Sequence, residues 1–156
     1  PLKELQLGTL GITPVEPEMV IPPEEVMTFT TTYRLAEDIS VLTINPHMHL
    51  LGTIFWAYAV DVEGDTIPLV RIPEWDFRWQ YAYTFPHMLP LYKGTTIHVH
   101  GTFDNTSENP NNPFDPPQEA LAPKDRNMRT TDEMFQFFIN YVDYKPGDEK
   151  ISLGAY

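Results

Sequence analysis

Short runs of β-branched and aromatic residues, separated by turn residues, recur along the chain. Such runs favour β-strands, and 16 prolines interrupt any longer helical pattern. We therefore predict strands at Val26–Leu35, Ile39–Ile44, Thr53–Asp61, Thr66–Ile72, Phe77–Phe85, Thr95–Phe103 and Met134–Tyr144, with weaker candidates near Lys3–Leu7 and Pro17–Ile21.

Several of these runs alternate between apolar and polar residues. In Thr95–Phe103, Ile97 and Val99 share one face and His98 and His100 share the other, as a strand with one buried side requires. About seven to nine such strands, joined by turns, predict an all-β fold, an antiparallel β-sandwich or jelly roll. The length is that of one domain, so residues 1–156 are expected to form a single sandwich.

One connection is unusually long. From Asn105 to Thr131 the chain shows no apolar period and is rich in Pro and Asn, apart from a short patch at Gln118–Leu121. Long loops in compact domains are commonly functional or mobile. We expect this loop to cover one end of the sandwich, with side-chain turns ordering Asp104–Pro113 and the greatest mobility around Pro116–Arg129.

Composition excludes several kinds of site and partner. The chain has no cysteine, which excludes disulfides, thiol nucleophiles and thiolate metal sites. Its net charge of −12 repels phosphate backbones, so no nucleic-acid partner is expected. No apolar stretch approaches the length of a membrane helix, so no membrane insertion is expected. The chain opens on Pro1, and we expect a mature protein or a piece of a longer one.

The candidate metal ligands are few. Four of the five histidines form two H-x-H pairs, His47 with His49 and His98 with His100, and residues two apart on a strand share a face. Neutral imidazoles suit Cu, Zn, Fe or Ni. The second pair lies on a polar strand face, which favours a simple solvent-exposed role. The first pair follows a strand expected to end at Pro46, next to a loop where sites are often built, so it is the better candidate.

A third ligand has to come from another part of the chain. Met134 follows Thr131-Asp132-Glu133 at the start of an aromatic strand. A methionine in this place is usually core filler, but a thioether beside two imidazoles would favour copper, because soft sulfur stabilises Cu(I).

Five motifs in order carry a family resemblance. They are Pro46-His47-Met48-His49-Leu50-Leu51-Gly52, Trp75-Asp76-Phe77-Arg78-Trp79-Gln80, Lys93-Gly94-Thr95, Asp104 to Pro113 and Thr131-Asp132-Glu133-Met134. From about residue 26 to 145 the chain resembles the C-terminal domain of copper type II ascorbate-dependent monooxygenases, relatives of peptidylglycine α-hydroxylating monooxygenase and dopamine β-monooxygenase, and most of all the bacterial members.

The resemblance implies a jelly-roll domain with one copper ion held by His47, His49 and Met134. It also implies a copper-dependent monooxygenase that activates O₂ to hydroxylate a C–H bond of a small-molecule substrate. Ascorbate or a cytochrome- or redoxin-like partner would supply the electrons, outside the cytoplasm. The chain departs from the family in three respects. Eukaryotic members have disulfides, whereas this chain has no cysteine. Many bacterial members have Trp-Gly a few residues before Asp-Glu-Met, where this chain has Pro123 to Arg129, and two-copper members carry a second, three-histidine copper site on a preceding domain that is not among these residues.

Two other functions stay open. One is a copper-binding or electron-transfer module without oxygenase activity. The other is a cupin-like metal site at His98 and His100, but that pattern calls for a Glu soon afterwards, and Gly101–Ser107 contains none. The motif Trp75–Gln80 is interpreted as a structural strand entry whose aromatic residues fill the core, and His87 as an exposed loop residue.

Overall fold

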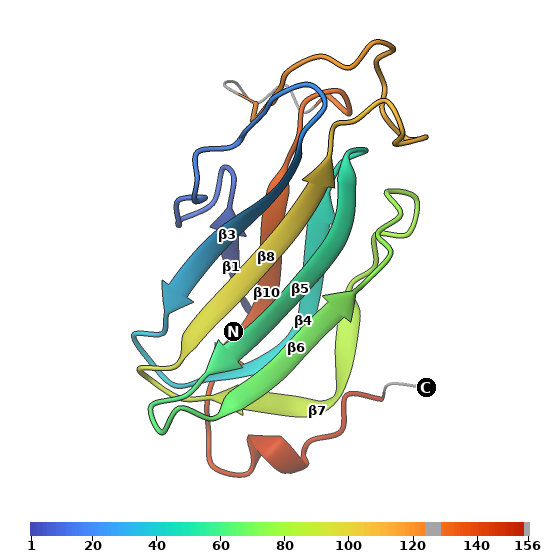
Figure 1. The fold of residues 1–156 in the computed structure, drawn as a ribbon. Coiled ribbons are helices and arrows are strands. Elements are labelled where there is room, and N and C mark those ends of the chain that lie inside the picture. Colours follow the sequence, from blue (N-terminus) through green and yellow to red (C-terminus); the bar gives the residue numbers. More distant parts are fainter. Residues whose placement is uncertain (124–128, 155–156) are drawn as a thin grey trace.

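The computed structural model describes residues 1–123 and 129–154 and contains two four-stranded antiparallel sheets packed face to face (Figure 1). One sheet has the order β1-β10-β4-β7, formed by Lys3–Gly8, Phe135–Asp143, Ile39–Met48 and Tyr83–Leu91. The other has the order β3-β8-β5-β6, formed by Val26–Arg34, Thr96–Asp104, Gly52–Val60 and Thr66–Ile72. This interleaved order is that of a jelly roll, so the predicted fold class is confirmed.

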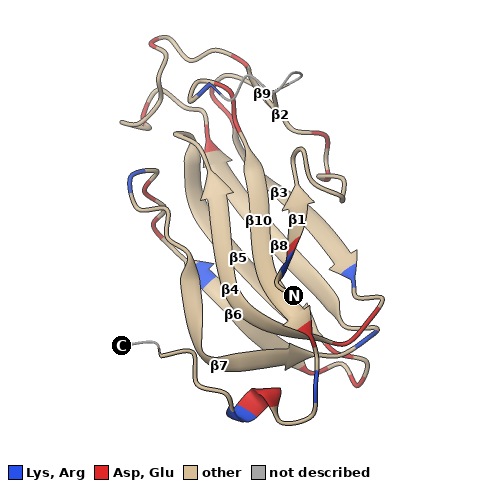
Figure 2. Cartoon of the chain, turned by 180° about the vertical axis from the view of Figure 1, so that it is seen from behind, with Lys and Arg blue, Asp and Glu red and all other residues tan. Residues whose placement is uncertain are grey.

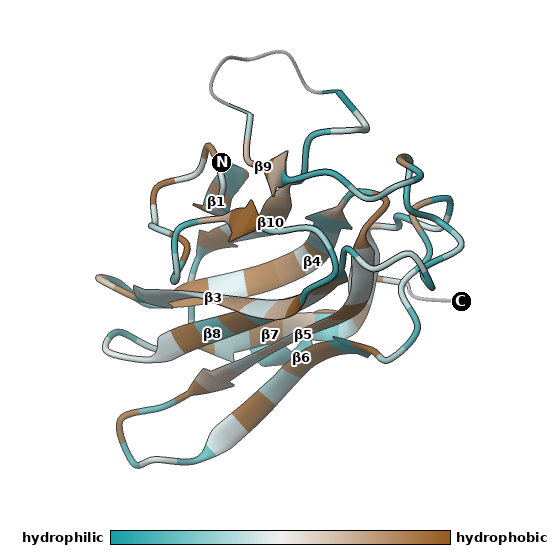
Figure 3. Cartoon of the chain, turned by 45° about the horizontal axis from the view of Figure 1, so that its top comes forward, coloured by the Kyte–Doolittle hydropathy of each residue, from teal (hydrophilic) through white to brown (hydrophobic). Residues whose placement is uncertain are grey.

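Period-two alternation builds the core between the sheets. Five phenylalanines are fully buried there, namely Phe29, Phe55, Phe103, Phe135 and Phe137. The Phe55 ring on one sheet lies 5.9 Å from that of Phe135 on the other. Figure 3 shows the apolar residues as bands along the strands and the connecting loops as mostly hydrophilic. Among the described residues no helix is long and apolar enough to cross a membrane, and the only helical element there is a short 3-10 helix, η1 (Asp148–Lys150).

The prediction of a strand at Phe77–Phe85 is wrong over most of its length. Phe77 and Arg78 form a turn, residues 79–82 have no regular secondary structure, and β7 begins at Tyr83 and continues to Leu91. The strand was predicted too early in the chain because the aromatic residues of this segment have a high strand propensity. β7 contains Pro86 and Pro90 and lies at the edge of its sheet, where proline is tolerated.

The expectation that a strand ends at Pro46 is also wrong, because β4 continues to Met48. The pairing of β4 with β7 extends only to Ile44 opposite Tyr83. Beyond that point β4 has β10 as its one neighbouring strand, and Pro46 lies opposite Phe137. A residue without an N–H fits where one side of the strand has no partner.

The long connection is more regular than expected. Ala120–Leu121 forms a two-residue strand, β9, which pairs with β2 (Val20–Ile21). As expected, side-chain turns order residues 104–113: the Asn109 side chain donates to the Asp104 carbonyl and accepts the Asn111 N–H. The loop lies at the end of the sandwich where β4 ends and β10 begins (Figure 1). Part of the segment expected to be most mobile, residues 124–128, lies outside the described residues, and its mobility remains a prediction.

Candidate metal centre

His47 and His49 lie at the end of β4, on the outer face of the β1-β10-β4-β7 sheet. Between them Met48 points inward and is fully buried, so the strand alternation turns both imidazoles outward. Their ring centroids are 5.0 Å apart and their planes are nearly perpendicular, at 89°. His47 is half-buried, and His49 is only 4% exposed.

Each imidazole forms a hydrogen bond through Nδ1 with an oxygen atom. His47 Nδ1 lies 2.5 Å from Gln80 Oε1, and His49 Nδ1 lies 2.6 Å from the main-chain carbonyl oxygen of Asp132. Both oxygens can only accept, so in the neutral rings both Nδ1 atoms carry the proton and donate it. The lone pair of each neutral ring is therefore on Nε2, the nitrogen left available for a metal ion.

Met134 directly precedes β10, the strand that pairs with β4. In the register of β4 and β10, Met48 lies opposite Phe135 and His47 opposite Gln136. The paired residues end at Phe135, so the expected approach of the Met134 side chain to the histidines stays a prediction. Met134 is 1% exposed, yet it does not belong to the contiguous hydrophobic core of the sandwich.

The carboxyl group of Glu133 holds the turn after β4. Its Oε2 accepts the His49 N–H at 3.1 Å, and its Oε1 accepts the Leu51 N–H at 2.7 Å. Burial raises the pKa of Glu133 to about 8, although hydrogen bonds from the N–H groups of Leu51, His49 and Met134 act in the opposite direction. The segment Asp132–Met134 thus contacts His49 through a carbonyl oxygen and a carboxyl group.

Burial also lowers the pKa of His47, an effect that the hydrogen bond with Gln80 opposes and that the neighbouring His49 reinforces. A lowered pKa keeps the imidazole neutral, and only the neutral form can bind a metal ion. Phe77 packs edge-on against His49, with ring centroids 5.6 Å apart. The ring centroid of Phe138 lies 6.5 Å from that of His47.

The donor set fits a soft metal ion. Among the described residues no three His, Asp or Glu side chains are grouped closely enough to hold a metal ion. A centre at His47 and His49 therefore needs a ligand of another kind, and the thioether of Met134, which is buried, is the expected one. Two imidazoles with one thioether match the preference of copper, above all of Cu(I).

The other histidines lie apart from this pair. His98 and His100 occupy the outer face of the opposite sheet, where their rings stack on Tyr58 at 5.0 and 5.7 Å. The Tyr58 plane is within 13° of each imidazole plane, so the two rings stack instead of converging on one point. His87 is exposed on β7, and its main chain pairs with Ser152.

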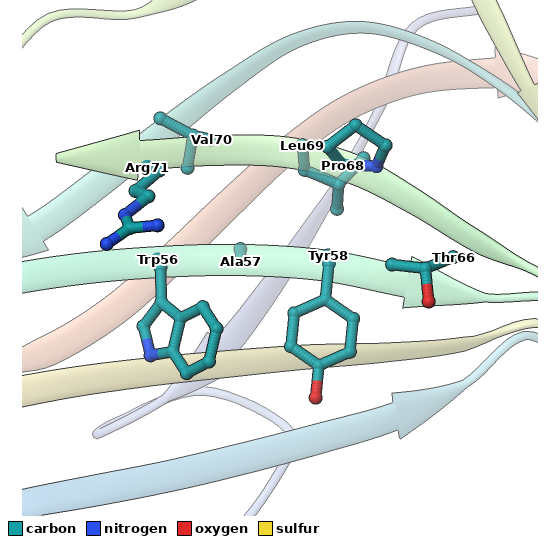
Figure 4. A pocket seen from close by; sticks show the side chains of 8 residues that line it. All are labelled: Trp56, Ala57, Tyr58, Thr66, Pro68, Leu69, Val70 and Arg71. Atoms are coloured by element: carbon teal, nitrogen blue, oxygen red, sulfur yellow. The ribbon is translucent and has the colours of Figure 1, made fainter.

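A hollow also lies on that opposite sheet (Figure 4). It has a volume of about 700 Å³ and lies along β5 and β6, with Trp56, Tyr58, Pro68 and Arg71 among its lining residues. Figure 2 shows that the acidic residues gather mainly in loops and at strand ends. The hollow and the histidine pair of β4 are separate features on opposite faces of the sandwich.

Sequence reasoning proposed His47, His49 and Met134 as ligands, which stays a prediction, and it missed the residues that hydrogen-bond to and pack on the two histidines. Gln80 and Phe77 belong to the motif Trp75–Gln80, which was interpreted as structural, and Asp132 and Glu133 precede Met134 in its motif. Their presence in the motifs that carry the family resemblance was the signal that could have identified them.

Comparison with known proteins identifies one family. The family model described as "Copper type II ascorbate-dependent monooxygenase, C-terminal domain" matches residues 6–113, more than two thirds of the chain. The matched region includes His47, His49 and Gln80 and ends before Met134. No curated protein matches the chain.

Proposed function

The chain belongs to the family of copper type II ascorbate-dependent monooxygenase C-terminal domains, and on this premise we propose that it binds one copper ion and activates O₂ to hydroxylate a C–H bond of a small molecule. The ligands would be Nε2 of His47, Nε2 of His49 and the sulfur of Met134. The observation that carries the proposal is the pair of adjacent imidazoles, 5.0 Å apart and both hydrogen-bonded through Nδ1.

The chain's own residues would prepare this chemistry. Burial keeps His47 neutral, Asp132 and Gln80 orient the rings, and Phe77 and Phe138 limit water around them. Copper, when bound, would supply the one-electron redox chemistry that the side chains lack.

The overall reaction needs an external reductant. One oxygen atom of O₂ enters the C–H bond and the other leaves as water, so each turnover consumes two electrons and two protons. Ascorbate, as the family description indicates, or a cytochrome- or redoxin-like partner would provide the electrons. From the family relationship we also propose that the protein acts outside the cytoplasm.

Copper titration of the metal-free protein tests the ligand set. Competition with a chromophoric Cu(I) chelator should show that His47→Ala and His49→Ala each lose most of the tight binding. The control His98→Ala, from the stacked pair on the other sheet, should retain it. Equal losses from both pairs would mean that the site is not at the end of β4.

Met134→Leu tests the thioether separately. Replacements that conserve side-chain volume typically cost less than ~1.5 kcal/mol of stability, so the fold should be nearly preserved. The affinity for Cu(I) should fall more than that for Cu(II), and the reduction potential should fall. An unchanged Cu(I) affinity would show that Met134 is a packing residue only.

A second candidate function is a copper-binding or electron-transfer module without oxygenase activity. The ligand inventory favours it, because the described residues offer no cluster of three His, Asp or Glu that could hold a second, electron-transfer copper ion. Oxygen uptake by the copper-loaded protein with ascorbate separates the two functions: the oxygenase consumes O₂ and the binding module does not.

A further inference from the structure

The segment between β6 and β7 is fixed to the sandwich at its start. Trp75 is 7% exposed, and its main-chain N–H donates to the Thr53 carbonyl oxygen at 2.8 Å. The next residue, Asp76, closes a turn by accepting the N–H of Arg78 at 2.9 Å and pairing with its guanidinium group. This anchoring holds Gln80, four residues after Asp76, against the end of β4.

The orientation of the Gln80 amide follows from its two partners. One amide end lies 2.9 Å from the Phe77 main-chain carbonyl oxygen, which can only accept, so that end is Nε2. The other end is then Oε1, and it faces His47 Nδ1. An oxygen acceptor at this position requires that Nδ1 carry the proton, which leaves the lone pair of the neutral ring on Nε2.

We propose that Gln80 is a positioning residue that selects the Nδ1–H tautomer of His47 and fixes its ring, so that Nε2 is the metal-binding nitrogen. For His49 the same selection is made by the main-chain carbonyl of Asp132, which no substitution removes. Gln80 is thus the side chain through which the tautomer of this pair can be altered. The role assigned at the metal rests on the proposed function, whereas the tautomer selection holds without metal.

Phe77 links the two imidazoles to one segment. Its carbonyl oxygen holds the Gln80 amide, and its ring packs against His49 at an interplanar angle of 83°. The segment therefore contacts both histidines, one through a hydrogen bond and the other through an aromatic edge, and orients them as a unit.

Nitrogen-detected NMR of the metal-free protein, at a pH where both imidazoles are neutral, tests the tautomer directly. We expect His47 to be protonated at Nδ1 in the wild type and to become a mixture of tautomers in Gln80→Leu. In Gln80→Glu, which keeps an oxygen acceptor, the Nδ1–H form should be retained. The His49 signals serve as the internal control, because the Asp132 carbonyl is unchanged in every variant.

Gln6→Leu is the matched control. Gln6 lies on β1, in the sheet that contains His47, opposite Phe138. Its side-chain amide donates to the Glu4 carboxyl group and not to an imidazole. It should leave the His47 signals unaltered. If Gln80→Leu does not fold, Gln80→Ala removes the acceptor with no added apolar surface. A wild-type His47 protonated at Nε2, or the same His47 tautomer with and without the Gln80 acceptor, overturns the proposal.

Copper provides a second readout. Loss of a group that orients a metal-binding histidine typically lowers metal affinity about 10–100-fold, so Gln80→Leu should weaken copper binding by that factor and Gln80→Glu should restore it. Pulsed EPR of the Cu(II) form should show an altered remote-nitrogen coupling for one imidazole only. Wild-type affinity and couplings in Gln80→Leu would contradict the role at the metal. A wild-type protein that binds no copper would instead refute the proposed function, and the NMR result would still decide the tautomer selection.

Discussion

Glu133→Leu removes the carboxyl group that holds the turn after β4. Glu133 is 1% exposed, and its two oxygens accept the N–H groups of His49 and Leu51. Leucine is of comparable size but has no acceptor. The substitution would therefore leave two buried main-chain donors without a partner in the turn that carries His49.

The size of the effect follows from these two bonds. A buried donor left unsatisfied costs about 1–3 kcal/mol. Because burial raises the pKa of Glu133 to about 8, its carboxyl is mostly protonated at pH 7, and hydrogen bonds to a neutral group are the weaker kind. We therefore expect the free energy of unfolding of the metal-free protein to fall by about 2–4 kcal/mol, from the lower part of that range for each donor.

Urea unfolding at pH 7, followed by tryptophan fluorescence, measures this loss. Glu133→Gln keeps one acceptor oxygen and should lose less than Glu133→Leu. Glu119 is exposed, so Glu119→Leu is the control and should change stability by less than about 0.5 kcal/mol. A change as small as that in Glu133→Leu would refute the reasoning, because the two N–H groups would then not depend on the carboxyl group.

Three further predictions concern the rest of the sandwich. Gly101→Ala would place a Cβ atom 2.8 Å from the Phe135 ring, and this overpacking should cost about 1–3 kcal/mol in chemical unfolding. The Asn105 amide donates to the main-chain oxygens of Ile21, at the end of β2, and of Gln118, so Asn105→Ala should lose about 2–3 kcal/mol and make residues 105–113 more sensitive to protease. The hydrogen bond from Ser40 lowers the pKa of Asp148. The ionised Asp148 carboxylate therefore stabilises the folded state above the ordinary carboxyl pKa, and this contribution is lost as the pH falls through the lowered pKa. The melting temperature of Asp148→Asn should accordingly be below that of the wild type at pH 7, and the difference should vanish in strong acid.

Some features of the fold could be predicted because they depend on neighbouring residues only. Alternation with a period of two located the strands of both sheets except β7 and showed that His47 and His49 share a face. The strand expected at Phe77–Phe85 was misplaced, because aromatic residues have the same propensity in a strand and in a loop segment that packs on a site. Proline was equally ambiguous: Pro46 suggested the end of a strand, but β4 continues through it where no neighbour needs its N–H.

The sequence by itself determined the strand character of the chain, its acidic and cysteine-free chemistry, and the shared face of the H-x-H pair, since each is set by local backbone geometry or by composition. Only the tertiary structure decided how the site is assembled. The pairing of β4 with β10 places Phe135 opposite Met48, and loop packing carries Gln80 to a histidine 33 residues away and Glu133 to one 84 residues away. Such pairings depend on how distant strands align and how loops close over them, and no short-range pattern encodes that alignment.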